Sequence, residues 1–265
     1  MEVGQSYASD PLHARPQEVP TAPPKNFIAR IIGAWFSPGE TFAEMKHSPN
    51  LLLPIIFAIV FGALTGFAMS QRLDMARMMR ENFDQAVADG QMKAEDADAQ
   101  AKTIGKFGSV QFVVVGALGV LISALVIAGI FKLISMMMGH ENTYAALLAV
   151  TLYAFIAVTL ISSVVFLILL YLKDPSEITF KNMGNVVSSN VASWVTLALG
   201  DNALPKFLNG LLSRIDLFSI WILALLSIGY AAVTHRMKTA TAATYLIALY
   251  VIYAVIASVV GSFMG

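Results

Sequence analysis

Residues 144–172 read YAALLAVTLYAFIAVTLISSVVFLILLYL and contain no charged side chain. A helix needs roughly 20 mostly apolar residues to cross the hydrocarbon core of a bilayer, so this run is long enough to cross it with a tilt or a bend. Four further runs are also uncharged: about 51–69, 110–131, 217–234 and 239–263. The pattern therefore predicts an all-α, polytopic transmembrane helical bundle with five spans.

The composition agrees with insertion into lipid. Hydrophobic residues make up 57% of the 265 residues and charged residues 13%, whereas soluble domains carry about 25% charged residues. The formal net charge is zero, so no basic field favours nucleic acid as a partner. Cysteine is absent, which excludes disulfides, thiolate metal sites and cysteine nucleophiles.

The N-terminal part divides into a tail and two short helices. Residues 1–26 are rich in proline and contain no apolar run, which predicts a disordered tail before a membrane domain at 27–265. Apolar residues then recur at helical spacing over 27–36, which indicates either an interfacial helix or a helix packed on the cytoplasmic end of the bundle. Ser37-Pro38-Gly39-Glu40 predicts a capping box that starts a second helix, ending near Lys46.

Two longer polar regions separate the spans. In the first, residues 70–108, Met75, Met79, Phe83 and Val87 form an apolar stripe, which predicts an amphipathic helical hairpin between the first two spans. The second region, residues 173–216, includes the apolar run Val191–Leu199. That run is too short to cross a bilayer as a helix, so we interpret it as interfacial or re-entrant, and a sixth span is the alternative.

The turn His235–Lys238 gives the orientation. Short basic loops stay in the cytoplasm, so this turn predicts a cytoplasmic N-terminus and a C-terminus on the outside. The two long polar regions, which this topology places outside, hold six and four of the seventeen Lys and Arg residues, which argues the other way. We follow the short turn because the rule weakens for longer loops.

The predicted spans contain few side chains that could carry out chemistry. Their centres contain hydroxyl groups but no Asp, Glu, His, Lys or Arg, the residues that bind or relay charge in ion-coupled transporters. The four histidines lie in the tail or at span boundaries, and nucleotide-binding and acyl-transfer motifs are absent. We therefore expect no enzymatic activity, no cofactor and no metal site.

A few residues are candidates for helix packing or for lining a cavity. Gly62 and Gly66 share one helix face, where a neighbouring helix could approach closely. Tyr245 and Tyr253 lie eight residues apart and face similarly, which fits a packing seam as well as a cavity. Asp216 is placed to cap the fourth span, and a binding role with Arg214 is the alternative. The full set is Gly62, Gly66, Tyr153, Thr159, Asp216, Trp221, Tyr245 and Tyr253.

Two segments resemble the Yip family, the Ypt/Rab-interacting membrane proteins. One is Ser37-Pro38-Gly39-Glu40-Thr41-Phe42 ahead of Pro49 and the first span. The other is Asp216-Leu217-Phe218-Ser219-Ile220-Trp221, which runs into Gly229, a short basic turn and a last span. The resemblance covers residues 27–263 and is closest to the bacterial branch. It implies a five-span bundle in the bacterial inner membrane with a cytoplasmic N-terminus.

The resemblance transfers no binding residue. The DLYGP-type motif of the eukaryotic members is absent as such, because Asp216-Leu217-Phe218 matches only its beginning and lies late in the chain. A GTPase partner is therefore not carried over. Two functions remain: a non-enzymatic protein that organises membrane partners or bilayer shape, or an uncoupled transporter or lipid-handling protein for a neutral or amphipathic small molecule. The expected partners are membrane lipids, other membrane proteins or further copies of the chain.

Overall fold

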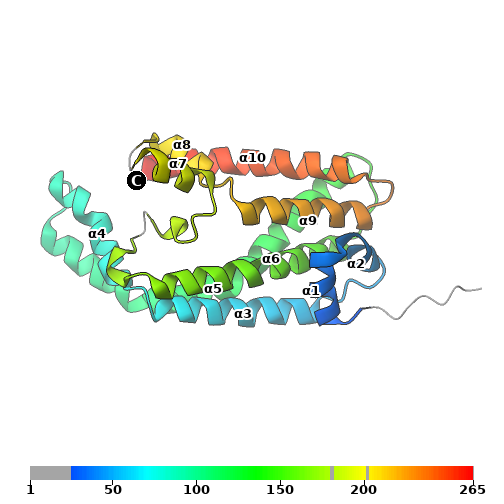
Figure 1. The fold of residues 1–265 in the computed structure, drawn as a ribbon, viewed down its shortest axis with the longest axis horizontal. Helices are drawn as coiled ribbons and strands as arrows, with labels where there is room; N and C mark the ends of the chain where they lie inside the picture. The colour runs from blue at the N-terminus through cyan, green and yellow to red at the C-terminus, as the bar shows by residue number, and fades with distance from the viewer. Residues whose placement is uncertain (1–24, 180–181, 201–202, 265) are drawn as a thin grey trace, which may run out of the picture.

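The structure is a computed structural model that describes residues 25–179, 182–200 and 203–264, so most of the predicted tail lies outside the described residues. The described part is helical and has no strand, as predicted for an all-α bundle (Figure 1). The longer helices are α3 (Leu52–Ser70), α5 (Ala94–Met137), α6 (Tyr144–Leu172), α9 (Leu217–Val233) and α10 (Thr239–Met264). The shorter ones are α1 (Phe27–Phe36), α2 (Pro38–Glu44), α4 (Met75–Ala88), α7 (Val191–Leu199) and α8 (Lys206–Leu212).

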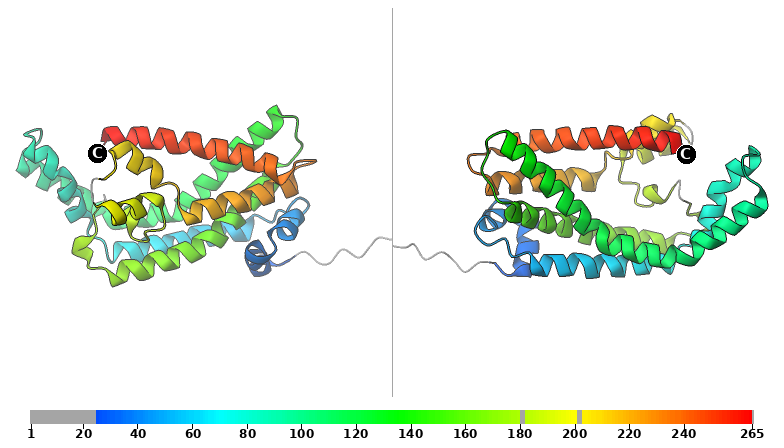
Figure 2. Two further views of the ribbon diagram at one scale, coloured as in Figure 1. Left: turned by 45° about the horizontal axis from the view of Figure 1, so that its top comes forward. Right: turned by 180° about the vertical axis from the view of Figure 1, so that it is seen from behind.

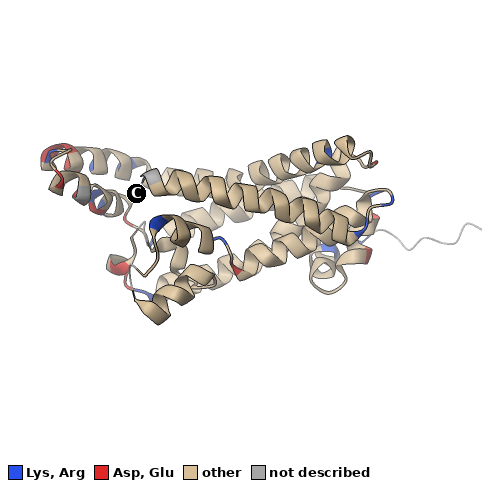
Figure 3. Ribbon diagram, turned by 90° about the horizontal axis from the view of Figure 1, so that it is seen from above, with Lys and Arg blue, Asp and Glu red and all other residues tan. Residues whose placement is uncertain are grey.

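Four helices are long and apolar enough to cross a membrane: α3, α5, α6 and α10. The fifth predicted span, α9, is apolar but has only 17 residues, which is at the lower limit for a crossing. Figure 3 shows the charged residues gathered mainly toward the two ends of the long helices. Together these features describe a membrane protein with several spans, and the number five stays a prediction.

The helices form two layers joined through α6. Helices α3, α5 and α6 run side by side, and α9 and α10 form a second layer (Figures 1 and 2). Helix α9 packs on α6, while α10 packs mainly on α9 and α8. The main apolar cluster is centred on the first half of α6, from Ala146 to Val158, where nearly every side chain is buried, and a smaller cluster lies between the hairpin and the far end of α6.

The predicted hairpin between the first two spans is present, but its second arm is not a separate helix. Helix α5 begins at Ala94 and continues without a break into the span that the sequence placed from about residue 110. Gly105 and Gly108 lie inside this helix and face α4, where a Cβ at either position would come within 2.5 Å of Ala76 or Met75. The glycines therefore let the two arms pack closely instead of ending the helix.

The hairpin is tied to the loop after α6. The guanidinium of Arg77, on α4, donates hydrogen bonds to the carbonyl oxygens of Pro175, Ser176 and Ile178. Arg72, which precedes α4, donates to the carbonyl oxygens of Tyr171 and Lys173. These bonds hold the hairpin beside the end of α6 that is opposite to α1 and α2 (Figure 1).

The N-terminal helices lie at the other end of the bundle, and α1 runs across the long helices there (Figure 1). Both are present where predicted, but the capping box is wrong. Ser37 ends α1 and precedes α2, and its side chain makes no capping hydrogen bond, while its backbone N–H donates to the carbonyl oxygen of Gly33. Because one residue serves both helices, its backbone follows the end of α1 and does not adopt the extended conformation that an N-cap prefers.

Candidate functional site

Several polar contacts of the second layer gather at the break between α8 and α9. The hydroxyl of Tyr250 donates a 2.6 Å hydrogen bond to the carbonyl oxygen of Arg214, in the break. On α8, a Cβ placed on Gly210 would lie 3.4 Å from Ser258. Tyr250 is near the middle of α10, so α9 begins partway along α10 and α8 lies beside the remainder (Figure 1).

This position changes the environment expected for Asp216 and Arg214. The sequence pattern placed both at the boundary of the fourth span, whereas the structure sets them beside the apolar middle of α10. The span centres are still uncharged, but a carboxylate and a guanidinium lie between the helices at that level. The position of Arg214 and Asp216 along α10 could not be predicted from the residues around them, because it depends on how α9 and α10 are staggered. One signal was available, since a run of 17 residues is much shorter than the 26 residues of α10.

Asp216 caps α9, as predicted. Its Oδ1 accepts hydrogen bonds from the backbone N–H groups of Phe218 and Ser219, at 2.9 and 3.1 Å, and Oδ2 accepts one from the Ser219 hydroxyl. A carboxylate at a helix N-terminus satisfies free N–H groups and interacts favourably with the helix dipole. The cap therefore stabilises the start of a helix that begins among apolar side chains.

Arg214 is held separately from Asp216. Its Nη1 donates a 2.6 Å hydrogen bond to the carbonyl oxygen of Gly210, and its guanidinium lies 5.7 Å from the ring centroid of Tyr253. Its Nε is buried and has no hydrogen-bond partner among the described residues. Arg214 and Asp216 are close in the chain, but their charged groups contact different partners. The alternative prediction, a joint binding role of the two residues, stays a prediction.

A polar loop completes the site from the other side. The backbone N–H of Val191 donates to the carbonyl oxygen of Ile215 at 3.0 Å, and that of Leu217 donates to Ser189 at 3.2 Å. Asn190 is buried, and its Oδ1 caps α7 by accepting from the backbone N–H and the hydroxyl of Ser193. Helix α7 has the predicted bounds, and this loop links its start to the break before α9.

The remaining candidate residues lie elsewhere. Gly62 and Gly66 are in the seam between α3 and α5. A Cβ added to Gly62 would lie 2.0 Å from the carbonyl oxygen of Gly116, and one added to Gly66 would lie 2.1 Å from that of Phe112. The predicted close approach of a neighbouring helix is therefore confirmed. Tyr153 is buried under α1, and Thr159 is half-buried at the end of the buried part of α6.

The aromatic candidates of the second layer occupy different surroundings. Trp221 and Tyr245 are partly buried against the main apolar cluster. Tyr253 is 55% exposed and lies against Tyr250 and the Arg214 guanidinium. Asp216 and Tyr253 therefore both lie at the break, with different partners, while Tyr245 packs against the core.

Electrostatic contacts outside the spans are local. The hydroxyl and backbone N–H of Ser176 donate to Asp174 and lower the pKa of its carboxyl. The hydrogen bond from Arg80 to Asp98 joins the two arms of the hairpin and raises the pKa of Arg80. Among the described residues no group of three or more His, Asp or Glu side chains could hold a metal ion.

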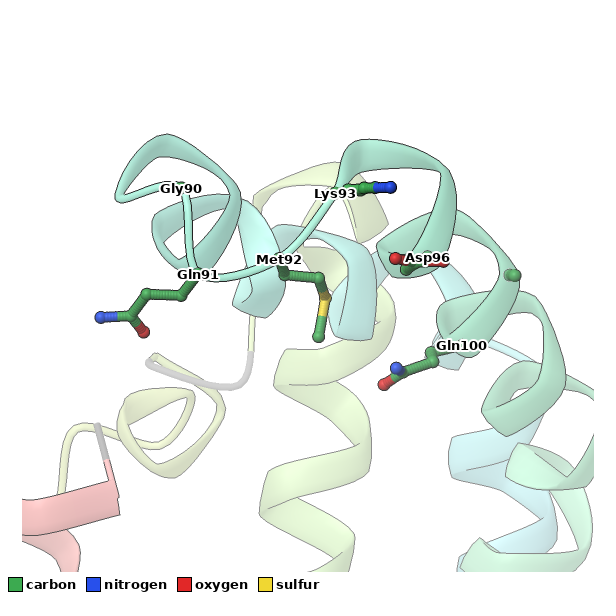
Figure 4. A pocket seen from close by; sticks show the side chains of 7 residues that line it. Gly90, Gln91, Met92, Lys93, Asp96 and Gln100 are labelled. Carbon is green, nitrogen blue, oxygen red and sulfur yellow. The ribbon is translucent and has the colours of Figure 1, made fainter.

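An open hollow of about 700 Å³ lies at the tip of the hairpin (Figure 4). Figure 4 shows Met92, Lys93, Asp96 and Gln100 around it, with the side chain of Gln91 directed to the other side of the loop. The lining contains one cation, one carboxylate and two amides but no nucleophile paired with a base. The hollow is formed by the turn between the two arms of the hairpin.

One comparison with known proteins identifies a family. The family profile of the Yip1 domain matches residues 32–261, from α1 into the last helix. Searches of curated proteins and of solved structures gave no match. The matched range contains the glycine seam between α3 and α5, the hairpin, the break before α9 and the basic turn before α10.

Proposed function

We propose a non-enzymatic organising role in the membrane for this chain, which belongs to the Yip family and is a multi-pass membrane protein. In this role the protein holds other membrane proteins in place or shapes the bilayer around it. We place it in the bacterial inner membrane, with the N-terminus in the cytoplasm and the C-terminus outside. The proposal includes membrane lipids as partners and no GTPase.

The observation that carries this proposal is that α1 packs on the bundle with one face and exposes large apolar side chains on the other. One face of α1 is buried against α6 and α2, while Ile28, Ile32 and Phe36 on the other face are exposed. Phe36 is 82% exposed. A helix that lies across the ends of the spans with large apolar side chains outward fits insertion into the interface or contact with a membrane partner.

Packing supports an organising role over a transport path through the first layer. The backbones of α3 and α5 touch at Gly62 and Gly66, which leaves no room between these helices. The ring of Tyr153, one of the candidates for lining a path, packs against Phe27 with ring centroids 5.8 Å apart. These contacts fill the space that a neutral solute would need.

The second candidate function, handling of an amphipathic small molecule or lipid, is favoured by one observation. The break before α9 presents a partly unsatisfied Arg214 beside the middle of α10. Short helix breaks at membrane depth are where transporters place polar binding groups. A polar head group could bind there while its apolar part contacts α10.

Photocrosslinking in native membranes tests the organising role. With a photoreactive phenylalanine analogue at Phe36, we expect a reproducible set of crosslinked membrane proteins, because this side chain points away from the bundle. The matched control is the same analogue at Leu64, an apolar and exposed position on α3. Capture of the same proteins from both positions, or of none from Phe36, would argue against specific partners of α1.

Reporter fusions test the orientation. We expect a periplasmic reporter to be active at the C-terminus and a cytoplasmic reporter to be active in the turn around Arg236. The reason is that we expect the chain to cross with α3, α5, α6 and α10 and to return once more through α9, the predicted fourth span. A cytoplasmic signal at the C-terminus would overturn the odd number of spans.

A further inference from the structure

Arg30, on α1, is a buried arginine that has no counterion within the described part of the chain. It is 1% exposed, and none of Nε, Nη1 and Nη2 has a hydrogen-bond partner among the described residues. Its guanidinium carbon lies 5.9 Å from the centroid of the Tyr153 ring, on α6, and the guanidinium also interacts with the hydroxyl of that tyrosine. The guanidinium thus lies in the seam between α1 and α6, surrounded mainly by apolar side chains.

The buried guanidinium destabilises the position in which α1 packs against α6, which we call the docked position. Arginine keeps its charge in proteins, so burial cannot be relieved by loss of a proton. An ionised group taken out of water needs a paired charge and hydrogen bonds, and five N–H donors are left without them here. The cation–π contact with Tyr153 offsets only part of that cost.

Apart from the apolar packing of Ile31 and Ala34 in the main cluster, few polar contacts attach α1 to the rest of the described chain. The indole Nε1 of Trp35 donates a 2.8 Å hydrogen bond to the carbonyl oxygen of Ala157, on α6. At the other end, Lys25 forms a 3.3 Å ion pair with Glu44, and both side chains are partly exposed, so the pair contributes little. Ser37, the one residue between α1 and α2, has no side-chain cap that would fix the junction.

The outer face of α1 already suits a membrane surface. Ile28 and Phe36 are exposed on this face, and Phe27, at the start of α1, packs against Phe57 on α3, where the apolar span begins. If α1 rotates or lifts away from α6, these side chains can stay in the lipid while Arg30 reaches the headgroup level. Guanidinium and phosphate groups pair through two parallel hydrogen bonds, which would satisfy donors that the seam leaves unpaired.

We propose that α1 is a strap that opens toward anionic lipid: the Arg30 guanidinium leaves the seam between α1 and α6 and pairs with the phosphate of an anionic phospholipid. Free phosphate offers the same oxygens, but only a phospholipid also contacts Ile28 and Phe36. The inference concerns α1 alone and holds whether or not the chain organises protein partners.

Spin labels can measure the opening directly. The chain contains no cysteine, so Ile28→Cys and Leu64→Cys give one label on α1 and one on α3 without further changes. The full chain is placed in nanodiscs of phosphatidylcholine, alone or mixed with phosphatidylglycerol. We expect a single distance distribution in neutral lipid and, with phosphatidylglycerol, a second population displaced by about 10 Å, one helix diameter.

Variants then assign the response to Arg30. Arg30→Met should abolish the lipid-dependent population and keep the docked distance, which also shows that the variant folds. Lys238→Met removes one positive charge from an exposed position at the same end of the bundle and should leave the response unchanged. Inorganic phosphate added to neutral nanodiscs should not open the strap.

Four results would overturn the proposal. The first is a distance distribution that does not depend on lipid charge, and the second is an equal response in Arg30→Met. The third is opening by inorganic phosphate alone, which would assign the site to a soluble anion. The carboxylates of residues 1–24 are tested by changing Glu2, Asp10 and Glu18 to their amides, and opening of this variant in neutral lipid would make them the counterions instead.

Discussion

Gly62→Ala is expected to destabilise the folded protein by about 3 kcal/mol, because the added methyl group has nowhere to go. Its Cβ would lie 2.0 Å from the carbonyl oxygen of Gly116 and 2.7 Å from the carbonyl carbon, both of them backbone atoms of α5. A flexible side chain could move aside, but a helix backbone cannot. The two helices must therefore separate, and overpacking of this kind costs 1–3 kcal/mol even in adaptable cores.

The same helix supplies a matched control. Gly119, three residues after Gly116 on α5, has no atom within 4 Å of its would-be Cβ. Gly119→Ala should leave stability unchanged or raise it by up to about 1 kcal/mol, since alanine is the better helix former. Unfolding of both variants in mixed micelles, followed by loss of helical circular dichroism, measures the difference. Equal stabilities for Gly62→Ala and Gly119→Ala would contradict the packing of the seam.

The helices themselves were predictable because each apolar run is bounded by polar residues or by residues that start or end a helix. Helices α6 and α7 have the bounds that the sequence predicts, since Thr143 and Asn190 cap their starts through side-chain oxygens. The continuation of α5 was not predictable in this way. Gly105 and Gly108 weaken a helix in isolation, and only contact with α4 shows why they are tolerated there.

Some residues of the candidate site, Arg214, Asp216 and Tyr253, could be predicted, but Tyr250, Asn190 and the position of the site could not. Asp216 as a cap follows from one residue at the head of an apolar run, which is local information. Its place beside the middle of α10 follows from the contact of Tyr250 with Arg214, which are far apart in the chain. The capping box at Ser37 is wrong for a related reason, since the residue also has to end α1.

Arg30 shows the same limit most clearly. In the sequence it is a single charge beside an apolar stripe, where it would ordinarily face water or the lipid headgroups. The structure turns it toward Tyr153, because Ile31, Gly33 and Ala34 on the same face pack against α6 and α2. A pattern of apolar residues cannot distinguish the two faces of a helix that is apolar on both.

Arg30→Met is expected to stabilise the detergent-solubilised protein by about 2 kcal/mol, opposite in sign to most core substitutions. Methionine keeps much of the length of the side chain and fills irregular apolar space, while it removes the unpaired guanidinium. Replacement of buried charges by apolar residues of similar size is often neutral or stabilising, by 1–4 kcal/mol. Arg30→Ala removes the same charge but leaves a cavity under α1, so its stability should fall below that of Arg30→Met. Unfolding in a neutral detergent measures all three proteins, and a loss of stability in Arg30→Met would show that the guanidinium has a partner in the folded state.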